Sequence, residues 1–433
     1  MYVAQDHETR DEDKEAHVRP NWPLLILVTS MPLQNIYLGH IPKLGPGLNY
    51  LNIMVALAFL VWKFREDLSP PTRTCMKGPM YTYVAIFVLS AIVGMVKLGP
   101  LGEGIPEALK DMMTPLLLYF IVLNSVRDRK GVIMMITATL IPLPYIFRVF
   151  NAQLSSLASW HYSDNLRLVH GTFMLLGSNE MAAFFAGYSL VLLALVWYIK
   201  KPKIRMVLAA LLILELYCLL YGYSRGAWLS FLGGFAMMGI YLNKKITITS
   251  ILLVLLLQGP VLSLLPVSVQ ERFGTIEVEK GQERDNSAES RFVLWGIAME
   301  DYKHSPIFGI GYRVFQNTNR LAKDTHNYYV KMLTEQGIIG LLVFLTILWR
   351  VFRMSRELAN KAGDDPLYRA LGVGMIGCVV AFFIGNMFGD RFSHYPMITY
   401  FWVYAALVQR SLYLAQGGDP DPDEEYAVYA RTQ

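Results

Sequence analysis

Long apolar segments recur along almost the whole chain and constrain its fold more than any other feature of the sequence. A helix needs about 20 apolar residues to cross the hydrocarbon core of a bilayer. Backbone groups find no water there, so only helices and closed β-barrels can span it. The segments are continuously apolar and lack the alternation of barrel strands. The sequence therefore predicts an all-α, polytopic membrane protein.

Twelve such segments can be placed, which predicts about twelve transmembrane helices. They cover residues 22–39, 48–62, 81–98, 112–126, 131–149, 171–199, 204–222, 226–242, 246–265, 337–352, 369–389 and 395–415. The fourth could start as early as Ile105. The predicted division is a tail over 1–21, helices one to nine over 22–265, a loop over 266–336, helices ten to twelve over 337–415, and a tail over 416–433. The loop is too polar to span a membrane.

Composition agrees with this reading. Hydrophobic residues make up 54% of the chain and charged residues only 17%, below the roughly 25% of soluble domains. The net charge of +5 does not indicate nucleic-acid binding, because Lys and Arg gather in short clusters between apolar segments. Three cysteines at unrelated spacings predict neither a disulfide framework nor a zinc site.

The basic clusters also predict orientation, since cytoplasmic loops are enriched in Lys and Arg. They lie at residues 63–65, 127–130, 200–205, 244–245 and 350–361. Twelve helices place all five clusters on one side of the membrane. Both termini are then cytoplasmic, and the 266–336 loop is extracytoplasmic.

Within this loop, residues 286–302 predict an amphipathic helix that lies over the membrane domain. Ser287 is a plausible N-cap, and acidic Glu289 suits a first helical turn. The apolar face is expected from residues spaced by three and four: Phe292, Trp295, Met299 and Tyr302.

Two arginines are candidate anion ligands. Arg225 begins an apolar helix, and helix N-termini attract phosphate. Arg291 lies in the first turn of the predicted loop helix. Guanidinium groups bind phosphate through paired hydrogen bonds, so two of them from different segments would suit a diphosphate. The simpler alternatives are a snorkelling Arg225 and a solvated Arg291.

His326 is the strongest candidate for a general base, because imidazole can accept a proton near neutral pH. The alternative is a surface histidine at a helix end, a description that fits His304 better. Asp390 and Arg391 are adjacent where helix eleven leaves the membrane, and a local ion pair between them is the favoured interpretation. Glu180 is a buried polar candidate whose alternative role is hydrogen bonding between helices.

Several chemical motifs are missing from the sequence: the P-loop, the His-Glu-x-x-His zinc motif, the Gly-x-Ser-x-Gly elbow and an Asp-x-Asp metal site on the outer side. The sequence therefore predicts chemistry without a metal or another cofactor.

Four short motifs occur in one order around the long loop. They are Ser224–Trp228, Ser290-Arg291 with Trp295, Gly309–Tyr312, and His326-Asn327 with Glu335 and Gly337. In this order and within a twelve-helix frame, the chain resembles the bacterial O-antigen ligase and polymerase superfamily. The resemblance is best over residues 170–345, and elsewhere it is mostly a similar hydropathy pattern.

The resemblance implies a C-type glycosyltransferase fold in the bacterial inner membrane, with a periplasmic active site. It implies transfer of a glycan from undecaprenyl diphosphate to a hydroxyl of a lipid or glycan acceptor. By analogy, Arg225 and Arg291 would hold the diphosphate, and His326 would activate the acceptor. Second-tier candidates are Asn327, Glu335, Asp390, Arg391 and Glu180.

Two alternatives stay open. A repeat-unit polymerase would use a second lipid-linked unit as its acceptor, although the single long loop with His326 favours the ligase. A transporter or flippase of lipid-linked sugars would also have about twelve helices. It would be expected to carry charges at mid-membrane and symmetric halves, whereas the prominent charges here cluster at the outer boundary.

Overall fold

The computed structural model describes residues 19–33, 49–65, 72–156, 161–162, 176–256, 263–274 and 286–417. Their regular structure is helical, with no strand in these ranges, so the predicted all-α membrane fold is confirmed. Most of both predicted tails, and parts of the predicted spans 22–39, 171–199 and 246–265, lie outside the described residues. The division into tails, helices and loop stays a prediction.

The first half of the bundle contains α1 (Trp22–Ser30), the 3-10 turn η1 (Met31–Leu33), α3 (Tyr50–Phe64), α4 (Lys77–Leu98), α5 (Ile105–Ser125), α6 (Arg129–Leu140), α7 (Leu143–Ser156), α9 (Ser178–Tyr198) and α10 (Pro202–Leu220). The second half contains α11 (Arg225–Leu242), α12 (Lys244–Leu256), α14 (Val267–Gly274), α15 (Asn286–His304), α16 (Val314–Thr318), α17 (Tyr328–Lys361), α18 (Pro366–Gly385), the 3-10 turn η6 (Arg391–Ser393) and α19 (Tyr395–Ala415).

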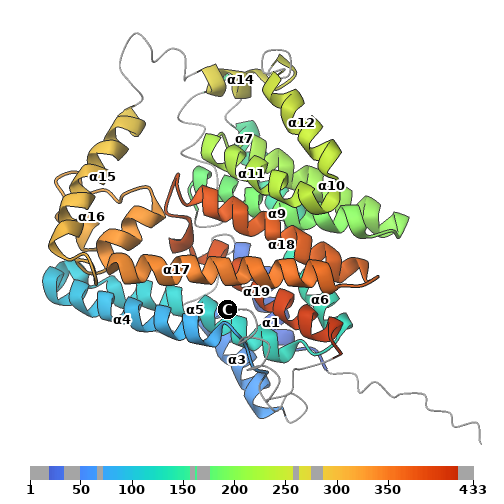
Figure 1. Ribbon diagram of the computed structural model, residues 1–433, viewed down its shortest axis with the longest axis horizontal. Coiled ribbons are helices and arrows are strands. Elements are labelled where there is room, and N and C mark those ends of the chain that lie inside the picture. Colours follow the sequence, from blue (N-terminus) through green and yellow to red (C-terminus); the bar gives the residue numbers. More distant parts are fainter. Residues whose placement is uncertain are drawn as a thin grey trace, which may run out of the picture.

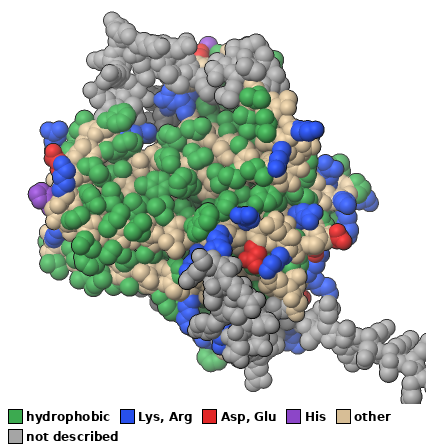
Figure 2. Space-filling model, viewed as in Figure 1, with side chains coloured by type: hydrophobic (Ala, Val, Ile, Leu, Met, Phe, Trp, Pro, Cys, Tyr) green, Lys and Arg blue, Asp and Glu red, His purple; other side chains and the backbone are tan. Residues whose placement is uncertain are grey.

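Within the described ranges, five helical stretches are long and apolar enough to cross a membrane. They are Lys77–Gly102, Arg129–Ser155, Ser178–Tyr198, Tyr328–Lys361 and Pro366–Gly385. Hydrophobic side chains form a broad area across the middle of the face shown in Figure 2. The count of twelve stays a prediction, although a helix coincides with each predicted span. The fourth takes the earlier of its two predicted starts, because α5 begins at Ile105.

The centre of the bundle is formed by α9, α11 and α18, which lie side by side (Figure 1). Glycines permit this close approach. A Cβ on Gly374 of α18 would lie 2.7 Å from the Cα of Val191 in α9, and one on Gly234 of α11 would lie 2.5 Å from the carbonyl oxygen of Gly377. Small residues at such contacts let helix backbones pack closely in membranes.

The tenth predicted helix differs from the structure at its start. Instead of beginning at residue 337, α17 starts at Tyr328 and has a break at Gly337, whose φ is +69°. The extra turns carry Lys331 and Glu335, both buried. Hydropathy therefore places the start too late, because the protein interior accommodates these charged side chains.

The predicted loop helix exists as α15 and packs on α17, but its packed face differs in part from the predicted one. Leu294 and Ala298 are fully buried, whereas Phe292 is 68% exposed. Trp295, Met299 and Tyr302 of the predicted face are partly buried. The helix begins at Asn286, so Ser287 lies in the first turn and is not the N-cap.

Backbone contacts anchor the segment after α15 to the break in α17. Ile310 N donates to Thr334 O at 2.8 Å, and Ile338 N donates to Pro306 O at 2.9 Å. Gly309 and Gly337 both have positive φ. A Cβ on Gly337 would collide with the carbonyl of Ile307. Two of the motifs found in the sequence therefore meet here and fix the polar segment against the bundle.

Candidate active site

His326 lies in the turn before α17 and is bound by Asp324. One carboxylate oxygen of Asp324 accepts from the His326 backbone N at 2.7 Å and lies 2.9 Å from its Nδ1. The His326 side chain is 46% exposed. Burial alone would raise the pKa of the Asp324 carboxyl, but the hydrogen bonds and charge of His326 hold that pKa well below its usual range. An ionised carboxylate therefore faces one side of an accessible imidazole.

The local chain holds His326 in an uncommon backbone conformation, with φ at +48°. On its C-terminal side, Asn327 caps α17 by accepting from Tyr329 N at 3.0 Å and Val330 N at 3.3 Å. On its N-terminal side, the carbonyl of Thr325 accepts from Trp295 Nε1 of α15 at 2.8 Å. Helix capping and the packing of α15 thus fix the turn that presents the imidazole.

Arg291 lies one helical turn before Trp295, so both side chains project from the same side of α15. The buried Leu294 and Ala298 belong to this side, which packs on α17. Arg291 therefore lies on the side of α15 that packs on α17, and its proximity to His326 stays a prediction.

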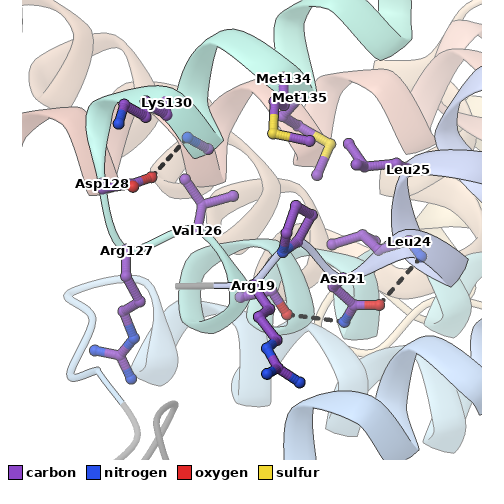
Figure 3. Close-up of a pocket in the computed structure, with 13 residues that line it drawn as sticks. Arg19, Asn21, Leu24, Leu25, Val126, Arg127, Asp128, Lys130, Met134 and Met135 are labelled. Atoms are coloured by element: carbon purple, nitrogen blue, oxygen red, sulfur yellow. Dashed lines mark hydrogen bonds between the residues drawn. The ribbon is translucent and has the colours of Figure 1, made fainter. Parts of the chain in front are cut away.

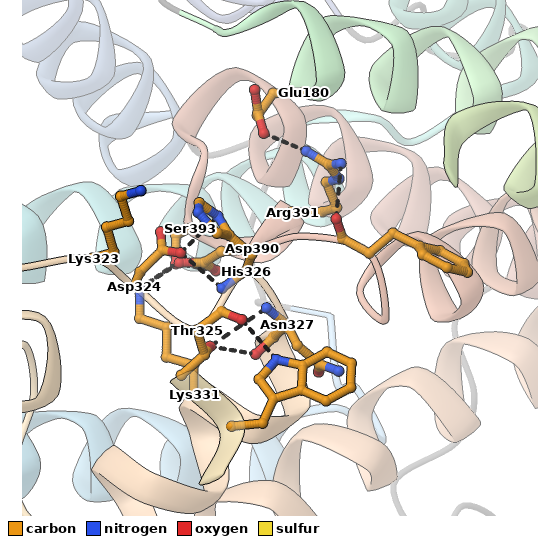
Figure 4. A network of polar contacts seen from close by, with 12 residues as sticks. Glu180, Lys323, Asp324, Thr325, His326, Asn327, Lys331, Asp390, Arg391 and Ser393 are labelled. Carbon is orange, nitrogen blue, oxygen red and sulfur yellow. Dashed lines mark hydrogen bonds and ion pairs between the residues drawn. The ribbon is translucent and has the colours of Figure 1, made fainter. Parts of the chain in front are cut away.

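Lys331 of α17 forms a buried ion pair with Asp390, in the turn between α18 and α19 (Figure 4). Lys331 Nζ also donates to Ser393 Oγ at 3.2 Å, and that hydroxyl donates to the other Asp390 oxygen at 2.6 Å. The Lys331 ammonium lies 5.8 Å from the centre of the Tyr312 ring. Each charge in this cluster is compensated, as buried charges require.

The predicted ion pair between Asp390 and Arg391 is wrong. Arg391 pairs instead with Glu180 of α9, and Figure 4 shows the two neighbouring side chains directed to different partners. The Arg391 side chain is 3% exposed and that of Glu180 22%. The turn between α18 and α19 is therefore joined to α17 by one ion pair and to α9 by another.

Arg225 is the first residue of α11 and follows Ser224 at its N-cap position. A Cβ on the next residue, Gly226, would lie 2.7 Å from the Cβ of Phe388. The start of α11 therefore packs against the same turn that carries Asp390. Arg225 and Arg291 belong to two helices, α11 and α15, that are separate in Figure 1, and a joint contact with one diphosphate stays a prediction.

Glu335 is buried at the break in α17. Its backbone carbonyl accepts from Ser90 Oγ at 2.8 Å and from Gly311 N at 3.1 Å. Its carboxylate faces the backbone N–H of Arg313 and the charge of Lys331. These contacts join α4, α17 and the segment after α15, which is a packing role.

The sequence reasoning missed Asp324, Lys331 and Ser393. Lys331 had a usable signal, because a charged residue two turns before an apolar run needs a partner. Asp324 had a weaker one, since it lies two residues before the candidate base. Nothing in the sequence distinguishes Ser393 from other polar residues of its turn.

Comparisons with known proteins point to the same part of the chain. Residues 210–345 match a family model described as O-antigen ligase, a region that includes Arg225, Arg291 and His326. An uncharacterized protein of Haemophilus influenzae is 24% identical over 168 residues, which cover 34% of this chain and 42% of that protein. The shared region thus spans less than half the length of this relative. The match over residues 210–345 supports a relationship of this membrane protein to the O-antigen ligase and polymerase superfamily, a glycosyltransferase-like group of polysaccharide biosynthesis.

Proposed function

We propose that this protein transfers an oligo- or polysaccharide from undecaprenyl diphosphate to an acceptor hydroxyl, in the manner of an O-antigen ligase. The reaction takes place at the periplasmic face of the bacterial inner membrane. The observation that carries the proposal is the accessible His326 with Asp324 bound to its Nδ1 at 2.9 Å. It is supported by the family match over the segment that contains the candidate base and both arginines.

His326 acts as the general base. A carboxylate at Nδ1 favours the tautomer with its proton on that nitrogen, which leaves Nε2 free to accept. Nε2 takes the proton of the acceptor hydroxyl as the oxygen attacks the anomeric carbon. The bond from that carbon to the phosphate oxygen breaks, and undecaprenyl diphosphate leaves. A single displacement inverts the anomeric centre, and Asp324 stabilises the imidazolium that forms.

Arg225 and Arg291 bind the diphosphate. Negative charge grows on the leaving group as the glycosidic bond breaks, so cations fixed nearby bind the transition state more tightly than the ground state. Arg291 belongs to α15 and Arg225 to the start of α11, so the proposed clamp draws on two helices. The site is thus assembled between the 266–336 loop and the membrane helices.

The remaining candidates position the site. Asn327 fixes the turn of His326 by capping α17. Asp390 and Arg391, through Lys331 and Glu180, hold the turn between α18 and α19 against α17 and α9.

A reconstituted reaction tests this function. Purified protein in detergent receives a lipid-linked glycan and a lipid A–core acceptor, without nucleotide or added metal. The expected products are free undecaprenyl diphosphate and one glycan on each acceptor. A ladder of longer lipid-linked chains would instead identify a polymerase. Movement of intact lipid-linked glycan across vesicles, without its cleavage, would identify a transporter. Loss of activity with a chelator, restored by one divalent ion, would contradict metal independence.

A further inference from the structure

A cavity of about 230 Å³ lies between the start of α1, the end of α5 and the start of α6. It is remote from the candidate active site. The Arg313 guanidinium donates to Gly104 O at 3.3 Å, which places the start of α5 beside the segment that packs on α17. The cavity lies at the opposite end of this 21-residue helix, about 30 Å away at 1.5 Å per residue.

The wall of the cavity is apolar. It includes Leu24 and Leu25 of α1 together with Met134 and Met135 of α6. Close to it, Trp22 is 61% exposed on α1 and would face lipid in a membrane. Tryptophan at a helix end is typical of the boundary between hydrocarbon and headgroups. The cavity thus lies where an acyl chain and a headgroup meet.

The rim of the cavity is positively charged. Arg19, Arg127 and Lys130 line it, and Figure 3 shows the guanidinium groups of Arg19 and Arg127 pointing the same way, with the methionines on the other side of the view. Among the described lining residues, Asp128 is the one carboxylate. It caps α6 by accepting from Gly131 N at 2.7 Å. Two hydrogen bonds, to Asn124 O and Thr72 Oγ1, each 3.0 Å long, fix Arg127.

We propose that this cavity binds the phosphate headgroup of an anionic phospholipid. The cationic rim matches the phosphate, and the apolar wall matches the start of an acyl chain. The volume is below the roughly 300–1,000 Å³ of sites for drug-sized ligands, a size that suits a phosphate headgroup. The basic run 127–130 also puts this end on the predicted cytoplasmic side, where anionic lipids concentrate. This site is independent of glycan transfer.

Lipid retention by the purified full-length protein tests the proposal. Native mass spectrometry compares phosphatidylglycerol with phosphatidylcholine supplied in equal amounts. Changing Arg19→Gln and Lys130→Gln together should weaken phosphatidylglycerol retention about tenfold or more and leave phosphatidylcholine unchanged. The matched control is Lys201→Gln with Lys203→Gln, two exposed basic residues on the same predicted side. An equal loss in this control would assign binding to diffuse charge and overturn the proposal.

Two further results separate the occupants. Met134→Trp fills the cavity without changing charge and should also displace the lipid; unchanged retention in this variant contradicts a cavity site. Glycerol phosphate, which has no acyl chains, should compete poorly with phosphatidylglycerol for the cavity. Competition as strong as that of the lipid would show that the site binds anions without recognising an acyl chain, and it would contradict the lipid assignment. If phosphatidylglycerol binds there only after removal of residues 2–16, the occupant is the chain's own acidic run Asp11–Asp13 and the lipid assignment is wrong.

Discussion

A single carboxylate oxygen of Asp324 contacts both the backbone N and the imidazole Nδ1 of His326, at 2.7 and 2.9 Å. The contact to the backbone holds the turn in its left-handed conformation, and the contact to the ring fixes which imidazole nitrogen faces outward. The orientation of the candidate base is therefore set by a residue two positions away in the chain.

We expect Asp324→Asn to lower kcat for glycan transfer about 10- to 100-fold with little change in donor KM. The asparagine keeps the size of the side chain but loses the charge that stabilises the imidazolium. Asp364→Asn, at an exposed aspartate near the other end of α17, is the control. A kcat equal to that of the wild type in Asp324→Asn would show that the carboxylate only shapes the turn.

Asp324 itself should not titrate in the working range. Its pKa is lowered in the folded protein, so it adds stability at every pH above the unfolded value of ~3.9, and this stability is lost only as the pH falls through the lower folded value. The difference in unfolding temperature between wild type and Asp324→Asn should therefore persist down to about pH 4 and shrink below it. A difference that has already vanished at pH 5 would contradict the persistent ionisation of Asp324.

For the arginine of α15, we expect Arg291→Ala to weaken donor binding and to lower kcat, because the side chain is assigned to both the bound and the departing diphosphate. Arg291→Lys should recover only part of the activity, since an ammonium lacks the paired donors of guanidinium. Lys303→Ala, which removes an exposed cation at the end of the same helix, is the control and should leave donor binding and kcat unchanged. Wild-type affinity and turnover in Arg291→Ala would remove this residue from the site.

The ion pair of Lys331 and Asp390 can be tested through stability. Changing one partner leaves a buried charge alone, so Lys331→Met and Asp390→Leu should each destabilise the protein by about 3–5 kcal/mol. The double variant should recover much of this loss. Thermal unfolding in detergent gives the coupling free energy by a double-mutant cycle. Additive losses would mean that the two charges act independently.

Gly337 and Gly296 form a matched pair of glycines. Gly337→Ala should destabilise the protein by at least about 2 kcal/mol, because alanine is strained at a φ of +69° and its Cβ would meet the Ile307 carbonyl. Gly296 lies within α15 with open space around it, so Gly296→Ala should be neutral or stabilise the helix by about 0.5–1 kcal/mol. Equal effects in unfolding experiments would contradict the close packing of the Gly309 segment on α17.

The sequence predicts the positions of the helices well because apolar length is a local property, and the early start of α5 was one of two predicted starts. The ion pairs between helices could not be predicted from the sequence. Lys331 and Asp390 are 59 residues apart in the chain, and Arg391 and Glu180 are 211 apart, so only the packed bundle selects these partners over the adjacent one. The buried face of α15 was missed in part for a related reason. The spacing of its large residues suggested one apolar stripe, but the most deeply buried positions are the smaller Leu294 and Ala298, and Phe292 is exposed.

The most direct test of the account is glycan transfer by His326→Gln in the reconstituted reaction, measured as release of undecaprenyl diphosphate. His304→Gln, at the exposed end of α15, is its matched control. Loss of a general base should slow transfer by about 10²- to 10⁴-fold while donor binding and the unfolding temperature stay near those of the wild type, and His304→Gln should keep full activity. Transfer by His326→Gln at the wild-type rate would contradict the assignment of His326 as the base.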